Sequence, residues 1–108
     1  MTVNEAVNAL GLTPVVLCDG ERRISGGYAG DLLSWVMGRA QADDAWVTIM
    51  SNNNIVAVAS LVDVACILLA EGVQPDPGVA DTARARGVNV LGSDKPAFAL
   101  CAELNKLL

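Results

Sequence analysis

Few side chains in this sequence are suited to chemistry, and the most suggestive of them form one polar run. Ser51-Asn52-Asn53-Asn54 comes directly after a stretch of β-forming residues and opens an apolar helix. In open parallel sheets, ligands bind at the carboxyl ends of the strands, and asparagine amides both donate and accept hydrogen bonds. The run also fits a plain structural role, because asparagine is a preferred helix N-cap. Two interpretations stay open: a site for a neutral or nucleotide ligand, or a cap with an Asx turn.

A glycine-rich stretch, Gly26–Gly30 (GGYAG), is the second candidate, and it precedes Asp31 and another predicted helix. Such a loop lets backbone N–H groups approach an anion at the positive end of a helix. The spacing is neither GxGxxG nor a P-loop, and Asp31 would repel a phosphate. The alternative is that the glycines meet backbone demands while Asp31 complements the helix dipole. The candidate ligand contacts are Gly26, Gly27, Gly30, Ser51, Asn52, Asn53, Asn54 and Gly72.

Histidine is absent, which excludes Ser-His-Asp and Cys-His catalysis and histidine metal sites. Any acid–base chemistry would fall to carboxylates such as Asp31, Glu71 and Asp76. Glu71 and Asp76 could bind Mg²⁺, but no supporting ligands accompany them, and solvated turn residues explain them more simply. We therefore expect no enzyme, no catalytic residue, no metal and no cofactor, and we keep a carboxylate-based enzyme as a remote alternative.

The composition predicts one domain, residues 1–108, with an aliphatic core and apolar surface left over. Hydrophobic residues make up 53% of the 108 residues, aromatic residues only 4%, and mean hydropathy is +0.43. The excess predicts a self-association face and therefore a homodimer. Net charge is −5 and the basic residues are scattered, so we expect no nucleic-acid partner.

Three cysteines, Cys18, Cys66 and Cys101, lie in apolar segments without CxxC spacing. They predict free, buried thiols in a reducing cytoplasm. No signal peptide is visible, and the longest apolar run, Ile55–Ala70, is too short and too interrupted to span a bilayer, so no membrane association is expected.

From Gly26 onward, helical and strand patterns alternate, which predicts an α/β domain with a central, mainly parallel sheet flanked by helices. Before this point we expect a helix with a Thr2–Glu5 capping box and then a β-hairpin turning at Asp19-Gly20. The expected strands are Val15–Cys18, Glu21–Ser25, Trp46–Met50, Ala65–Ala70 and Val88–Leu91, and later helices begin near Leu32, Ile55, Asp76 and Ser93 or Asp94.

The segment from Ile55 to Val62 is apolar on nearly every side, which predicts a helix buried by the sheet on one side and by another body on the other. Its small residues make it one candidate dimer face, and the helix that follows Asp31 is another. The candidate interface residues are Leu33, Val36, Met37, Val56, Ala57 and Ser60.

Two stretches, GGYAGDLLSWVM and AWVTIMSNNNIVAVASLVDVACILLAEGVQPD, resemble the DRTGG-domain family, over about four-fifths of the chain from Ile24 onward. The resemblance is to small stand-alone members, labelled by distant similarity to HPr kinase and found near iron-hydrogenase genes. It implies an α/β fold like the HPr kinase N-terminal domain. In larger proteins, such as pyrophosphatases with CBS domains, it implies a non-catalytic module for dimerisation and ligand sensing.

The chain departs from the signature that gives this family its name. Asn52-Asn53 stand where the family has Asp-Arg, and Ala70-Glu71-Gly72 stand where it has Thr-Gly-Gly. No P-loop supports the kinase label. The sequence therefore predicts a non-catalytic regulatory, ligand-binding and dimerisation module. The alternative is an adenine-nucleotide or small-anion sensor that uses Asn52–Asn54 and Gly26–Gly30 at the strand ends.

Overall fold

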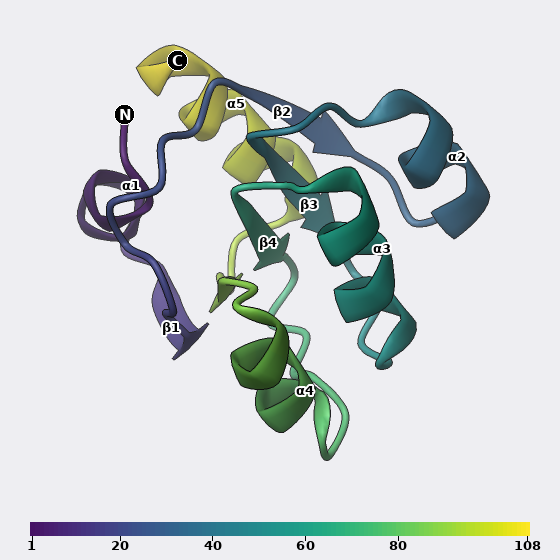
Figure 1. Cartoon of the computed structure of the whole chain (residues 1–108). Helices are drawn as coiled ribbons and strands as arrows, with labels where there is room; N and C mark the ends of the chain where they lie inside the picture. Colours follow the sequence, from purple (N-terminus) through teal and green to yellow (C-terminus); the bar gives the residue numbers. More distant parts are fainter.

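A five-stranded sheet runs through the middle of the molecule in the order β1-β5-β4-β3-β2 (Figure 1). The computed structural model describes all 108 residues, Met1–Leu108. The strands are β1 (Thr13–Val16), β2 (Gly26–Ala29), β3 (Asp44–Thr48), β4 (Cys66–Leu69) and β5 (Val90–Gly92). Strands β2 to β5 are parallel, and only β1 pairs antiparallel, with β5. The predicted α/β fold with a mainly parallel sheet is confirmed.

Helices cover the sheet on both faces, giving three layers (Figure 1). They are α1 (Val3–Leu10), α2 (Leu33–Arg39), α3 (Asn54–Val62), α4 (Val79–Arg86) and α5 (Ala97–Leu107). Because β2, β3, β4 and β5 follow one another across the sheet, right-handed crossovers place α2, α3 and α4 on the same face. The other face is covered from the two ends of the chain, by α1 and α5. None of the five helices has the length and hydropathy needed to cross a bilayer.

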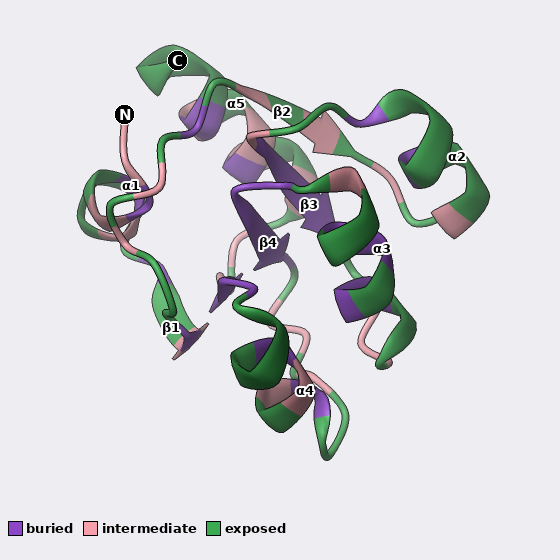
Figure 2. Cartoon of the chain, in the orientation of Figure 1, coloured by how far each residue is buried: buried purple, intermediate pink, exposed green.

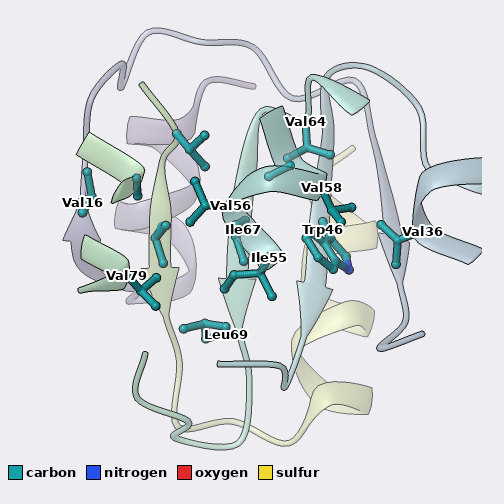
Figure 3. Packing of buried hydrophobic residues seen from close by; sticks show 14 of the residues in the cluster. Val16, Val36, Trp46, Ile55, Val56, Val58, Val64, Ile67, Leu69 and Val79 are labelled. Atoms are coloured by element: carbon teal, nitrogen blue, oxygen red, sulfur yellow. The ribbon is translucent and has the colours of Figure 1, made fainter. Parts of the chain in front are cut away.

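The core centres on β3 and β4, in which every residue is buried (Figure 2). Trp46, Ile67 and Leu69 point toward the α2–α3–α4 layer and pack with Ile55 (Figure 3). The alternate side chains, including Cys66, pack against α1 and α5. Burial raises the pKa of the Cys66 thiol to about 12, so this thiol stays protonated and acts as a packing group.

The first helix forms as its local sequence predicts. The Glu5 amide donates to Thr2 Oγ1 at 3.1 Å, and the Thr2 amide donates to Glu5 Oε1 at 3.1 Å. These two hydrogen bonds complete the capping box. Gly11 ends the helix with a left-handed φ of 62°. These hydrogen bonds with Thr2 lower the pKa of Glu5 because they favour its charged form.

The predicted β-hairpin at Asp19-Gly20 is wrong. β1 pairs with β5 instead, and Glu21–Ser25 forms no strand, contributing only an isolated bridge between Arg23 and Thr2. The cause is a distant side chain, Asn89, which is 3% exposed and holds the chain where the hairpin would turn.

Asn89 makes four hydrogen bonds that tie the N-terminal segment to the sheet. Its Oδ1 accepts from the amides of Cys18 and Asp19 at 2.8 and 2.9 Å. Its Nδ2 donates to the carbonyls of Asp19 and Ala65 at 2.9 and 3.0 Å. Both polar atoms of this buried amide are therefore satisfied, as buried polar groups require.

Arg22 makes a second tie at the amino end of the sheet. It forms ion pairs with Asp43 at 2.8 Å and Asp63 at 3.0 Å, and both aspartates have left-handed φ values, 68° and 67°. Burial acts to lower the pKa of Arg22, but the hydrogen bonds to the two aspartates raise it overall. The connections before β3 and after α3 are thus held by one guanidinium.

Three helix predictions need correction. The α3 helix is not buried all round, because Leu61 is 73% exposed and Ala57 and Ser60 are exposed with it. The α4 helix has Gly78 as its N-cap residue and begins at Val79, not next to Asp76. The α5 helix follows Pro96 and takes its cap from neither Ser93 nor Asp94.

We expect Asn89→Ala to lower the free energy of unfolding by about 2–4 kcal/mol, because the amides of Cys18 and Asp19 and the buried carbonyl of Ala65 lose the hydrogen bonds that Asn89 makes. Urea unfolding followed by circular dichroism measures this change. Asn8→Ala, at an exposed position of α1, is the matched control and should change stability by less than about 0.5 kcal/mol. Equal effects of the two variants would contradict the role given to Asn89.

Candidate functional site

A hollow of about 350 Å³ lies at the carboxyl-terminal edge of the sheet, and we call it the carboxyl-edge hollow. It forms where the chain leaves β2, β3 and β4, and the first residue of α5 closes one side. Its lining residues are Ala29, Gly30, Asp31, Val47, Thr48, Ile49, Glu71 and Ala97. This edge is where open parallel sheets bind ligands.

Asp31 is fixed in the hollow by two hydrogen bonds to the end of β3. Its Oδ1 accepts from Thr48 Oγ1 at 2.8 Å and from the Ile49 amide at 2.9 Å. Thr48 is 2% exposed, so its hydroxyl is held as firmly as the strand itself. The Asp31 carboxylate is thus placed by the sheet core and not by a flexible loop.

Glu71 enters the hollow from the turn after β4 and caps α5. Its Oε2 accepts from the Ala97 amide at 2.8 Å, and its own amide donates to the Lys95 carbonyl at 2.9 Å. The residue has a left-handed φ of 62°. A carboxylate at a helix N-terminus is favoured by the helix dipole. The Glu71 carboxylate therefore already occupies the position at the N-terminus of α5 where an anionic ligand could otherwise bind.

The two carboxylates set the chemistry of the hollow. Oδ2 of Asp31 and Oε1 of Glu71 take no part in the hydrogen bonds described, so each carboxylate keeps an acceptor oxygen for another group. Charged acceptors form the stronger class of hydrogen bond with amines and hydroxyls. They also repel phosphates. The arrangement therefore suits a ligand that presents hydrogen-bond donors.

The predicted glycine loop is wrong, because Gly26–Ala29 is strand β2 and not a loop. Gly26 lies at the opposite end of the strand from the hollow, with Asp44 Oδ1 only 2.8 Å from where a Cβ would be. Gly27 lies midway along the strand. Gly30 alone among the three lines the hollow, and its carbonyl accepts from Trp46 Nε1 at 2.9 Å.

The Ser51–Asn54 run lies at the same edge of the sheet but does not line the hollow. Asn52 Oδ1 accepts from the Asn54 amide at 2.9 Å, and Ser51 Oγ donates to Asp76 Oδ1 at 2.9 Å. Asn53 is the N-cap residue of α3 but makes no side-chain cap bond. Asx-turn geometry thus accounts for Asn52, while Asn53 and Asn54 stay exposed.

The remaining predicted contacts are scattered. Gly72, with a φ of 70°, lines a separate hollow of about 70 Å³ between β1, β5 and the turn after β4. Asp76 pairs with Ser51, whereas Glu71 caps α5, so these two carboxylates do not form the magnesium pair considered from sequence. No group of three or more histidine, cysteine, aspartate or glutamate side chains is placed to hold a metal ion.

Sequence reasoning missed Thr48 and Ala97 as parts of the site. Thr48 carried a usable signal, since it is a polar residue at the end of an otherwise apolar strand. Ala97 carried none, because the contact between its amide and Glu71 spans 26 residues of sequence.

A second cavity, of about 270 Å³, lies between β2 and the C-terminal half of α5, and we call it the α5 groove. Its lining residues are Gly27, Tyr28, Ala29, Val47, Cys101, Leu104, Asn105 and Leu108. Partial burial raises the pKa of the Cys101 thiol. None of the lining side chains carries a charge in this environment.

Two of the predicted dimer-interface residues cannot reach a partner. Val36 and Val56 are fully buried in the core against the sheet. Leu33 is half-buried, whereas Met37, Ala57 and Ser60 are exposed. Trp35, 51% exposed, stacks against Arg39 at 3.6 Å, so part of its indole ring is already covered.

Neither family models nor curated proteins give a match to this chain. A solved structure does: the crystal structure of the CBS and DRTGG domains of the regulatory region of Clostridium perfringens pyrophosphatase, complexed with the activator diadenosine tetraphosphate. The TM-score is 0.73 at 10% sequence identity. The match covers 95% of this chain but only 45% of that one, so this chain spans less than half of its length. At this identity the likeness shows the fold, and it supports a DRTGG-like fold.

We expect Glu71→Ala to lower the free energy of unfolding by about 1 kcal/mol, since α5 loses its only N-terminal cap. Glu71→Gln keeps an acceptor oxygen for the Ala97 amide and should lose less. Thermal and urea unfolding of both variants test this order, and Asp76→Ala, which removes only an exposed contact with Ser51, is the control. A smaller loss for alanine than for glutamine would contradict the capping role.

Proposed function

We propose that this protein is a non-catalytic regulatory module that binds a small molecule in the carboxyl-edge hollow. The observation that carries the proposal is the placement of Asp31 and Glu71 in one hollow at the ligand-binding edge of a parallel sheet. The fold shared with a regulatory region gives it further support.

The chemistry of the hollow favours the nucleoside end of an adenine nucleotide as the ligand class. Ribose hydroxyls and an exocyclic amine are hydrogen-bond donors that match two carboxylates, and acidic residues contact ribose hydroxyls in other α/β nucleotide sites. The phosphates would lie outside the hollow, in solvent. This proposal replaces a phosphate site at Gly26–Gly30 and Asn52–Asn54, because those residues are spread over both ends of β2 and the start of α3.

A binding role agrees better with the carboxylates than a catalytic one does. Asp31 and Glu71 each use one oxygen to hold the fold together, and Asp76 lies apart from them. The hydroxyl in the hollow that donates to a carboxylate, that of Thr48, belongs to a residue only 2% exposed, so it is poorly placed to attack a substrate as acyl or phosphoryl transfer would require. A cytoplasmic location and the small hydrogenase-associated family type stay predictions from the sequence.

We expect adenosine and AMP to raise the melting temperature, whereas inorganic phosphate should not. Ligand at about ten times its Kd adds about 1.4 kcal/mol, which corresponds to about 6 °C for a chain of this size. Asp31→Asn keeps an oxygen for Thr48 but removes the charge, and it should weaken adenosine binding by about tenfold. Differential scanning fluorimetry and calorimetric titration measure both effects.

The matched control is Asn53→Ala, because Asn53 is exposed and outside the hollow. This variant should bind adenosine as the unchanged protein does. Stabilisation by phosphate that Asn53→Ala abolishes would overturn the proposal in favour of an anion site at the start of α3. The absence of any shift with millimolar adenosine and AMP would also count against it.

A second function, homodimerisation, is favoured by the number of large apolar side chains left on the surface. Leu32, Trp35, Met37, Ile49, Leu61, Phe98, Leu107 and Leu108 are all more than 40% exposed. So many exposed large apolar side chains on a small chain favour a protein–protein interface. We propose that the module acts as a dimer.

We expect the protein to sediment as a dimer at tens of micromolar and to dissociate on dilution. Analytical ultracentrifugation over a hundredfold range of concentration measures this equilibrium. A monomer at every concentration would contradict homodimerisation without touching the ligand proposal.

A further inference from the structure

The β2 edge of the sheet is open. β2 is the last strand of the sheet on one side, and its four residues, GGYA, include no charged residue and no proline. The Gly30 amide donates to the Val47 carbonyl in β3. Because hydrogen bonding alternates along a parallel strand, Gly27 and Ala29 direct their N–H and C=O groups away from the sheet.

The opposite edge, β1, carries the protection that natural edges have. Pro14 lacks an N–H, and a bulge interrupts the register between Pro14 and Val16. Prolines and bulges are common devices against pairing with another chain. The sheet is therefore blocked at one edge and available at the other.

The α5 groove runs beside the open edge. It exists because β2 has no bulky side chains on the face below α5: a Cβ on Gly27 would lie 3.6 Å from Leu104 Cδ2. α5 packs directly on β2 and β3, and its last residue Leu107 and the following Leu108 are 42% and 46% exposed. An added strand would thus meet main-chain groups along β2 and an apolar groove beside it, the combination used in strand addition.

The groove is also lined by uncharged side chains in a protein that is acidic as a whole. The chain has a net charge of −5, so two copies repel each other over most of their surface. The groove lining has no charged side chain, and Glu103 of α5 is paired at 2.7 Å with Lys95, which precedes the helix. Two copies can therefore approach here without bringing charged side chains of the groove lining together.

We propose that the occupant of this edge is a second copy of the chain, with β2 pairing antiparallel to its counterpart about a twofold axis. The inference rests on the proposed homodimer and assigns its interface. With a twofold axis, the N–H and C=O groups of Gly27 and Ala29 in one copy can hydrogen-bond to those of Gly27 and Ala29 in the other. The sheet then continues across both subunits. The face is narrow, so the surface area buried between the two copies is at the low end of that found in specific interfaces. The dimer should therefore dissociate on dilution.

Two substitutions in this face test the assignment. Ala29→Asp places a charge on the open edge, and Leu108→Asp places one in the groove at an exposed position just after α5, outside the buried core. Each acts twice in a twofold interface, so each should raise the dimer dissociation constant by about a hundredfold. The matched controls, Ala57→Asp and Leu61→Asp on the exposed side of α3, should leave it unchanged.

Sedimentation and hydrogen exchange together decide the outcome. With the unchanged protein, exchange of the Ala29 amide should slow as concentration rises, and Leu108→Asp should abolish this protection. A dimer that survives Ala29→Asp and Leu108→Asp but is lost in Leu61→Asp overturns the β2 interface and leaves homodimerisation intact. A monomeric unchanged protein overturns both.

Discussion

Strands β3 and β4 are buried on both faces, and most of the other elements of the molecule serve to cover those two faces. All nine residues of the two strands are buried, so their backbone groups must pair within the sheet and their side chains need cover on both sides. Each large aliphatic residue, such as Leu68, contributes about 1.5–3 kcal/mol by leaving water. Connections between successive strands supply three helices on one face only. The other face depends on α1 and α5, which come from opposite ends of the chain.

This division of helices between faces creates the hollow. After β3 the chain turns toward α3 on one side of the sheet, whereas after β5 it turns toward α5 on the other. The ends of β2 and β3 are left between them, and Asp31 and Glu71 lie there. Both carboxylates also hold structure: Asp31 ties β2 to the end of β3, and Glu71 caps α5. Ligand binding at this position would therefore be coupled to the elements that cover the second face of the sheet.

The sequence predicted what depends on neighbouring residues. The capping box of Thr2 and Glu5, the α3 helix and the β4 strand all follow from local patterns, and all are present close to the expected residues. The alternation of helices and strands was enough to predict a mainly parallel sheet. The order of the parallel strands β2 to β5 is also consistent with simple crossover rules, once β2 is recognised as a strand.

What failed depends on residues far apart in the sequence. The hairpin was excluded by Asn89, about 70 residues beyond the turn that it holds. Gly26–Ala29 has too few side chains to show a strand pattern, although β3 provides a partner for it. Val36 and Val56 had the pattern of an exposed interface, but crossover packing buries them. The asparagine run attracted attention through its composition, whereas the hollow is built by Thr48, Asp31 and Glu71, from three separate segments.

The central claim is that the carboxyl-edge hollow is the ligand site. The most direct measurement is a titration with adenosine followed by ¹H–¹⁵N correlation spectra of the labelled protein. The account predicts saturable shifts of the Gly30, Ile49 and Ala97 amides, while the amides of Asn53 and Asn54 stay in place. Shifts confined to Asn52–Asn54, or no shifts at millimolar adenosine, would contradict it.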